Sequence, residues 1–181
     1  MKPNPNNLIW LDLEMTGLNP ARDRIIEIAV VITDGQLNVI AEGPALAIHQ
    51  PDDLMKSMDH WCTRTHTGSG LVDRVAISKL DEAHAEAQVL EFIMAHVPPG
   101  KSPLCGNSVH QDRRFMNKYM PKLEQYFHYR HLDVSTVKIL AQRWAPNVSK
   151  GLTKQVQHLA LSDIYDSIDE LKYYRKEIMK V

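Results

Sequence analysis

The chain has 181 residues, of which 44% are hydrophobic and 24% are charged, and its formal net charge is −1. This composition is typical of one globular domain, and it excludes a disordered chain or a protein that coats itself in nucleic acid through a global positive field. The two cysteines, Cys62 and Cys105, are too few to indicate a disulfide framework, so a reducing compartment is expected.

The N-terminal segment 1–7 is polar, and we expect it to be flexible. It lacks the apolar stretch of a signal peptide. No segment approaches the roughly 18 consecutive apolar residues of a membrane span. We therefore expect a single domain over residues 1–181 that is cytoplasmic and has no membrane partner.

The first fifty residues predict three consecutive strands. The apolar run Leu8–Met15 is followed by a turn-rich stretch and by a second apolar run, 24–33. Asp34-Gly35 is typical of a hairpin turn, and 39–47 supplies the third strand. Short turns between neighbouring strands indicate an antiparallel meander.

Helical periodicity dominates the rest of the chain. The expected helices span 81–97, 109–119, 136–144 and 163–179, and Ser135 and Ser162 are the expected N-caps of the last two. Short buried strands are expected at 102–106 and 131–134. This order predicts an α/β domain whose mixed sheet is flanked by helices.

Asp12 and Glu14 are the most informative residues of the chain. They interrupt the first apolar run, and because strand side chains alternate, both carboxylates project from the same face. Two anions on one face of a buried strand repel each other and resist desolvation. A divalent cation would relieve both effects, since hard cations bind carboxylate oxygens. On this pair alone, an edge strand whose Glu14 reaches water remains an open alternative.

Three further residues extend this pattern. Asp112 and Asp163 are each expected in the first turn of a helix, where the helix dipole alone also favours an acid. His158 precedes Asp163 by five residues, about 140° on a continuous helix, so the two converge only if His158 lies on the preceding loop. Four carboxylates can hold two Mg²⁺ or Mn²⁺ ions for in-line displacement at phosphorus, with Asp12 bridging both. His158 is then suited to take a proton from the attacking water.

This pattern resembles the DEDD exonuclease superfamily in its histidine variant. The first motif is matched by Asp12-x-Glu14, the second by Asp112 and the third by His158 with Asp163. Longer runs are similar to the oligoribonuclease family, over a region from about residue 8 to residue 177. These runs are Trp10–Leu18, Arg22–Ala29, Arg64–Thr67, Cys105–Ser108, Gln111–Phe115 and Phe127–Arg130.

The resemblance implies a ribonuclease H-like fold and a homodimer. It implies a 3′-to-5′ exoribonuclease that degrades short single-stranded oligoribonucleotides, chiefly diribonucleotides, to nucleoside 5′-monophosphates. Leu18 would wedge between two bases, and Trp61 would pack on the substrate, as aromatic residues do with any base. A closed pocket for the substrate's 5′ phosphate, shared with the partner subunit, would comprise His66, Ser108, Tyr129, Arg130 and Ser135.

Two positions depart from the family's pattern. His110 stands where many relatives are expected to have glycine, and Ser162 stands where a second acid is expected before Asp163. Neither replaces an expected ligand, although the missing acid removes a charge beside Asp163.

Two other functions remain open. One is a superfamily exonuclease that acts on longer RNA or DNA strands, which requires an open channel at the 5′ end. The other is a nucleic-acid-binding module that has lost catalysis. A zinc site around Asp59 and Cys62 is disfavoured, because the spacing matches none of the usual structural zinc patterns.

Overall fold

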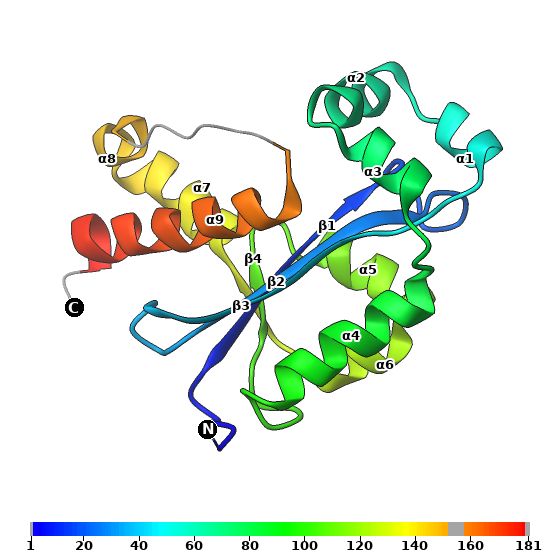
Figure 1. Cartoon of the computed structure of the whole chain (residues 1–181). Helices are drawn as coiled ribbons and strands as arrows, with labels where there is room; N and C mark the ends of the chain where they lie inside the picture. The colour runs from blue at the N-terminus through cyan, green and yellow to red at the C-terminus, as the bar shows by residue number, and fades with distance from the viewer. Residues whose placement is uncertain (1, 152–157, 180–181) are drawn as a thin grey trace.

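The structure is a computed structural model that describes residues 2–151 and 158–179. Its centre is a five-stranded mixed sheet with the strand order β3-β2-β1-β4-β5 (Figure 1). The strands are β1 (Leu8–Met15), β2 (Ile25–Thr33), β3 (Val39–Ala47), β4 (Leu104–Gly106) and β5 (His131–Asp133). The first three form an antiparallel meander, while β4 pairs in parallel with β1 and with β5. The predicted α/β fold with a mixed sheet is confirmed.

Helices cover both faces of the sheet. Figure 1 shows α4, α5 and α6 on one face, α7 and α9 on the other, and α1 to α3 beyond the end of the sheet where β1 finishes. The helices are α1 (Asp52–Lys56), α2 (His60–Gly68), α3 (Leu71–Ile77), α4 (Glu82–Met94), α5 (His110–Tyr119), α6 (Pro121–Tyr126), α7 (Val134–Trp144), α8 (Pro146–Lys150) and α9 (Ala160–Tyr174), which continues as the π-helix η1 (Arg175–Met179). Within the described ranges, no helix is long and apolar enough to cross a membrane.

The alternation of β1 decides which face carries the acids. Ile9, Leu11 and Leu13 pack into the core under α4, α5 and α6. Trp10 points the other way, into the core under α7 and α9. Asp12 and Glu14 share the parity of Trp10, so their carboxylates project toward the side of α9.

Two helices begin earlier than the sequence predicted. α9 begins at Ala160, so Ser162 lies inside its first turn and is not the N-cap. α7 begins at Val134, and its cap is Asp133, whose carboxylate accepts the Ser135 N–H at 2.9 Å; the prediction of Ser135 as N-cap is wrong. Serine is a good cap by local preference, but α7 is capped by the neighbouring Asp133, and the start of α9 has a distant acceptor, Glu27.

The N-terminal segment expected to be flexible is held in the structure. The backbone N–H of Asn4 donates to the carbonyl oxygen of His96 at 3.0 Å, and Nδ2 of Asn7 donates to the same oxygen at 3.1 Å. These bonds fasten the entry to β1 against the end of α4.

Candidate active site

Three carboxylates meet on the α9 side of the sheet. One oxygen from each of Asp12, Glu14 and Asp163 can be chosen so that all three lie within 4.8 Å of one another. In the described part of the chain, this is the one such group of acidic, histidine or cysteine side chains with metal-ligand spacing. Asp59 and Cys62 do not join it, because Asp59 accepts the Cys62 N–H at 2.8 Å and caps α2.

Asp112 reaches the same place from the edge of β1. Strand β4 pairs with β1 at Ile9 and Trp10 and ends at Gly106, which leaves the later part of β1 open on that side. There the Leu13 N–H donates to Oδ1 of Asp112 at 3.0 Å. The carboxylate thus replaces a missing strand partner, and this contact holds it next to Asp12.

Burial and mutual repulsion make these acids reluctant to ionise. The pKa of Asp12 is raised well above its usual range, first by burial and then by the charges of Asp112, Glu14, Asp163 and Glu27. Burial, followed by the charge of Asp163, raises the pKa of Glu14 to about 8, and burial raises that of Asp112 to about 7. A hard divalent cation would offset the repulsion between these acids, and carboxylate oxygens are the ligands that such a cation prefers. The residues present therefore fit a divalent metal centre.

His158 lies on the loop immediately before α9. Its backbone is in the left-handed region, with φ of 49°, and α9 begins two residues later. The sequence requirement that His158 stand outside the helix is met by this sharp turn. The imidazole contacts the ring of Trp61 edge-on, with the ring centroids 5.4 Å apart.

Asp12, Glu14, Asp163 and His158 line one cavity of about 830 Å³, and Asp112 lies behind Asp12 without lining it. Trp61 and Leu18 lie at the same cavity, and their exposed fractions of 52% and 64% show that both side chains face solvent. Exposed apolar and aromatic side chains beside the acidic cluster are suited to pack against nucleic-acid bases. The structure thus brings Leu18, Trp61, His158 and three of the predicted ligands to one opening.

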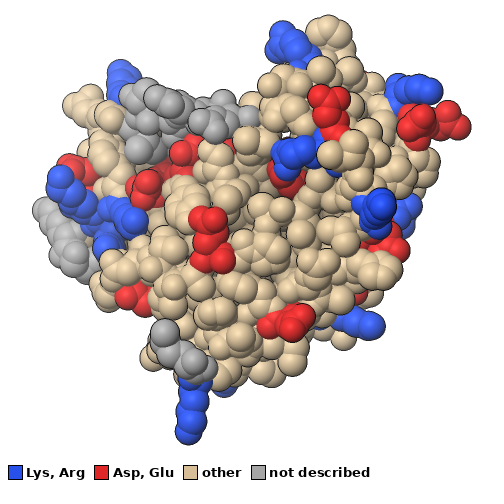
Figure 2. Space-filling model, in the orientation of Figure 1, with Lys and Arg blue, Asp and Glu red and all other residues tan. Residues whose placement is uncertain are grey.

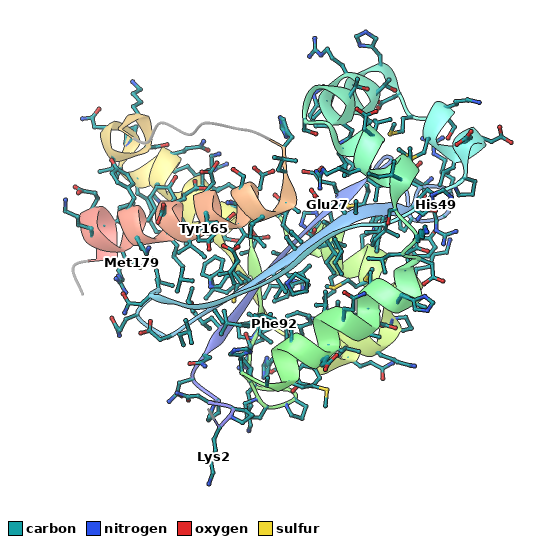
Figure 3. All side chains as sticks on the ribbon, viewed as in Figure 1. Lys2, Glu27, His49, Phe92, Tyr165 and Met179 are labelled. Atoms are coloured by element: carbon teal, nitrogen blue, oxygen red, sulfur yellow. The ribbon has the colours of Figure 1, made fainter. Side chains whose placement is uncertain are left out.

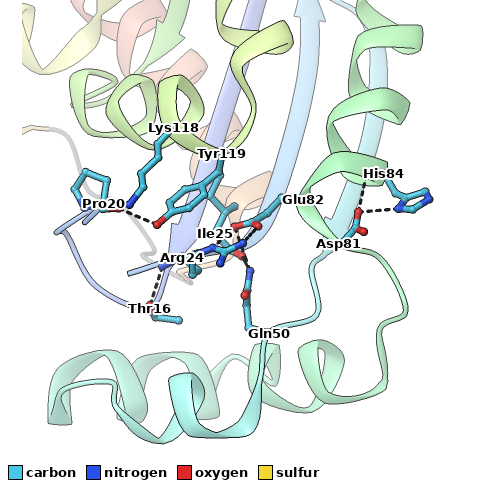
Figure 4. A network of polar contacts seen from close by, with 10 residues as sticks. All are labelled: Thr16, Pro20, Arg24, Ile25, Gln50, Asp81, Glu82, His84, Lys118 and Tyr119. Carbon is cyan, nitrogen blue, oxygen red and sulfur yellow. Dashed lines mark hydrogen bonds and ion pairs between the residues drawn. The ribbon is translucent and has the colours of Figure 1, made fainter. Parts of the chain in front are cut away.

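A polar network holds the loop that carries Leu18 against α5 and α4 (Figure 4). Tyr119 Oη and Lys118 Nζ both donate to the carbonyl oxygen of Pro20, at 2.8 Å and 2.6 Å. Arg24, at the end of the loop, lies over the Tyr119 ring and pairs with Glu82 at the start of α4. The loop is therefore positioned by α4 and α5.

His66, predicted to bind the 5′ phosphate, is buried beside the acids. Its side chain is 1% exposed, its Nε2 bonds the carbonyl oxygen of Met15 at 3.0 Å, and its Nδ1 lies 4.0 Å from Glu14 Oε2. Burial lowers its pKa, so the ring is neutral and donates through Nε2 to that carbonyl. Helix α2 holds the ring beneath Glu14, where His66 lines the same cavity as the acids.

The other residues of the predicted phosphate pocket form two pairs. The hydroxyl oxygens of Ser108 and Ser135 lie 3.1 Å apart, and the Ser108 N–H donates to Asp133 at 2.9 Å. The guanidinium of Arg130 lies over the exposed ring of Tyr129, 5.1 Å from its centre. Tyr129 and Arg130 directly precede β5, whereas Ser108 and Ser135 lie at the other end of that strand.

The surface charge is dispersed. In the view of Figure 2, Lys and Arg side chains lie around the rim, while the centre carries mainly uncharged residues and a few acids. Among the described residues of this face, no continuous basic surface is offered to a negatively charged ligand.

One buried acid near the site was missed by the sequence reasoning. Glu27 lies directly opposite Glu14 in the antiparallel register of β1 and β2, and it is 2% exposed. The sequence carried a signal like that of Asp12, because Glu27 is the single acid in the apolar run 25–32. The structure buries every residue of β2, Glu27 included.

Comparison with known proteins points to one family. A family model described as exonuclease matches residues 9–171. The chain is 63% identical to an oligoribonuclease of Marinobacter nauticus over 178 residues, which cover 98% of this chain and 99% of that protein. It is 61% identical to an oligoribonuclease of Bordetella pertussis over 181 residues, the whole of both proteins.

Solved structures agree on the fold. A structure of exonuclease I aligns with 97% of this chain at a TM-score of 0.72 and 19% identity. E. coli exonuclease I in complex with an oligonucleotide aligns with 99% of it, at a TM-score of 0.72 and 19% identity. The aligned region is 42% of each of those chains, so this chain spans about two fifths of their length.

Proposed function

This chain belongs to the exonuclease family, and from that premise we propose how it works. It is a metal-dependent 3′-to-5′ exoribonuclease that acts on short oligoribonucleotides, with a ribonuclease H-like fold. The observation that carries the proposed mechanism is the meeting of Asp12, Glu14 and Asp163 in one cavity with His158. Our proposal concerns the roles of these residues, the preferred substrate and the assembly.

We assign the metal-binding role to four carboxylates. Asp12, Glu14 and Asp163 already have oxygens within reach of one ion, and Asp112 adds a buried charge beside Asp12. Two bound Mg²⁺ or Mn²⁺ ions would stabilise the charge on the attacking and leaving oxygens of an in-line displacement. Asp12 would lie at the centre of this group, since its pKa is raised by the charges of all three other acids.

His158 is the proposed general base. It accepts a proton from the water that attacks the phosphorus of the last phosphodiester, and the bond from phosphorus to the 3′ oxygen breaks. The products are a nucleoside 5′-monophosphate and a strand that is shorter by one nucleotide and ends in a 3′ hydroxyl. The imidazole contacts Trp61 edge-on at the cavity that both residues line, and the φ of 49° marks the turn by which the chain enters α9.

The preferred substrate is a diribonucleotide. Leu18 and Trp61 offer apolar contacts to bases of any identity, which suits a sequence-independent enzyme. Ser108 and Ser135 of one protomer, with Tyr129 and Arg130 of its partner, would bind the 5′ phosphate and close that end. This division between two subunits accounts for the separation of the two pairs in one chain, and it makes the active form a homodimer.

We also place the enzyme in the cytoplasm with short RNA as its partner. Its two cysteines are free and buried, as expected in a reducing compartment.

A time course on 5′-labelled RNA of two, three, five and seven nucleotides, with Mn²⁺ or with a chelator, tests the proposal. Fastest cleavage of the dinucleotide, only with metal, supports both the metal centre and the closed 5′ end. Equal or faster cleavage of the longer strands would retain the metal centre and reject dinucleotide preference. No cleavage with metal present would indicate a binding module without catalysis.

A further inference from the structure

Glu27 stands behind the metal centre without facing its cavity. It lies on β2, between the start of α9 and α3 (Figure 3), with the same parity as Ala29 and Val31, which pack against α9. Its two carboxylate oxygens have different partners. Oε2 accepts the backbone N–H of Ala160 at 3.0 Å, and Oε1 pairs with Nη1 of Arg74 from α3.

The bond to Ala160 is made at a helix start that lacks a local cap. The N-cap residue of α9 is Leu159, whose side chain has no acceptor and makes no capping bond. The first N–H groups of a helix need acceptors from outside the helix. Glu27 supplies one from a position 133 residues earlier in the chain, and its negative charge also suits the positive end of the helix dipole.

The segment held in this way carries two of the reacting groups. His158 lies two residues before Ala160, and Asp163 lies three residues after it. Because the chain turns sharply at His158, its direction relative to the sheet depends on where α9 begins. Asp12 and Glu14 are fixed on β1, and Glu14 is paired directly with Glu27. Strand β2 pairs with β1, which carries Asp12 and Glu14, and the carboxylate of Glu27 on β2 bonds the start of α9, which carries Asp163.

We propose that Glu27, held by Arg74, is a positioning residue that caps α9 from the sheet and so sets the placement of His158 and Asp163 against Asp12 and Glu14. The proposal rests on the function proposed above. A displacement of about 1 Å between reacting groups can reduce turnover by about 100-fold. Glu27→Ala should therefore lower kcat on a diribonucleotide by about 10- to 100-fold and change KM much less.

Glu86 provides a matched control. It is also an almost buried acid, 6% exposed, and its Oε1 accepts the N–H groups of Lys122 and Leu123 at the start of α6, on the opposite face of the sheet. Glu86→Ala should lower the Tm to a similar extent and leave kcat within about twofold of the unsubstituted chain. Glu27→Gln keeps an acceptor oxygen for Ala160 and should recover part of the activity.

Two measurements without substrate separate positioning from general stability. Hydrogen exchange at the start of α9 should accelerate in Glu27→Ala and remain unchanged in Glu86→Ala. Calorimetric titration with Mn²⁺ should show weaker binding in Glu27→Ala, since Asp163 is displaced. Mn²⁺ binding, exchange at α9 and kcat equal to those of Glu86→Ala would overturn the proposal.

Two outcomes need a second variant or a second readout. If Glu27→Ala does not fold, Arg74→Ala decides: lower kcat at similar KM supports the proposal, and unchanged kcat refutes it. If neither the unsubstituted chain nor Glu86→Ala cleaves a diribonucleotide, the proposed function fails. The exchange and Mn²⁺ data still decide the role of Glu27.

Discussion

The backbone N–H of Leu13 donates a 3.0 Å hydrogen bond to Oδ1 of Asp112. This contact fills an edge of β1 that β4, ending at Gly106, leaves unpaired. It gives Asp112 a structural task and a chemical task at once, because the same carboxylate raises the pKa of Asp12. The two tasks can be separated experimentally, since an amide retains the acceptor and loses the charge.

Asp112→Asn should remain folded and lose turnover. The side-chain oxygen still accepts the Leu13 N–H, so the Tm in chelator should be equal to or higher than that of the unsubstituted chain. Loss of the charge at the metal centre should lower kcat by about 100-fold or more, as expected for a preorganised electrostatic group. Thermal unfolding and steady-state kinetics with Mn²⁺ measure both effects. Unchanged kcat would remove Asp112 from the metal centre.

The stability of the metal-free protein should fall as the pH rises from about 6.5 to 8.5. Glu14 and Asp112, with pKa values raised to about 8 and about 7, keep protons in the folded chain that they release in the unfolded chain, where carboxyl pKa values are about 4. The folded state therefore binds more protons, and the free energy of unfolding decreases by up to about 1.4 kcal/mol per pH unit for each proton retained. His66 opposes this trend only at the lower end of the window. Its lowered pKa keeps the folded ring neutral, while the unfolded imidazole, with a pKa of about 6.5, still binds protons there.

Added Mn²⁺ should remove this pH dependence, because the cation stabilises the ionised carboxylates. Metal binding at pH 7 should also release protons, which calorimetry in buffers of different ionisation enthalpy counts. Glu14→Gln should flatten the metal-free slope. A Tm in chelator that is constant between pH 6.5 and 8.5 would contradict the assignment of raised pKa values.

His158→Ala should slow the chemical step with little effect on binding. A general base contributes about 100- to 10,000-fold to the rate, so kcat should fall by that order while KM stays similar. His84→Ala is the control, since His84 is exposed and bonds Asp81 at the start of α4. A rise in KM at constant kcat would show that His158 binds substrate and does not transfer a proton.

Arg130→Ala should affect 5′-phosphorylated diribonucleotides more than those with a 5′ hydroxyl. The guanidinium is exposed over Tyr129 and offers paired donors to a terminal phosphate. We expect kcat/KM to fall about 10-fold or more for the phosphorylated substrate alone, in line with a charged hydrogen bond. Arg175→Ala, which affects a half-buried arginine bonded to Gln36, should change neither rate. Equal losses on both substrates would refute the phosphate pocket.

Local pattern was sufficient for much of this protein. The alternation of apolar residues in 8–15 predicted both β1 and the shared face of Asp12 and Glu14, because strand side chains alternate whatever lies around them. Turn residues and alternation also predicted the three-stranded meander, and a helical spacing of apolar residues predicted α4, α5, α7 and α9. The three helices between 52 and 77 did not, since they are short and pack beyond the end of the sheet.

The tertiary structure decided what depends on partners distant in the chain. The N–H of Ala160 at the start of α9 donates to Glu27 of β2, a partner 133 residues away that no local cap preference reveals. The packing of α2 buries His66 against Met15 and Glu14. The sequence by itself determined which chemical groups this protein has and which of them share a strand face. Burial and long-range hydrogen bonds, which form only when the elements pack, decided which of them meet.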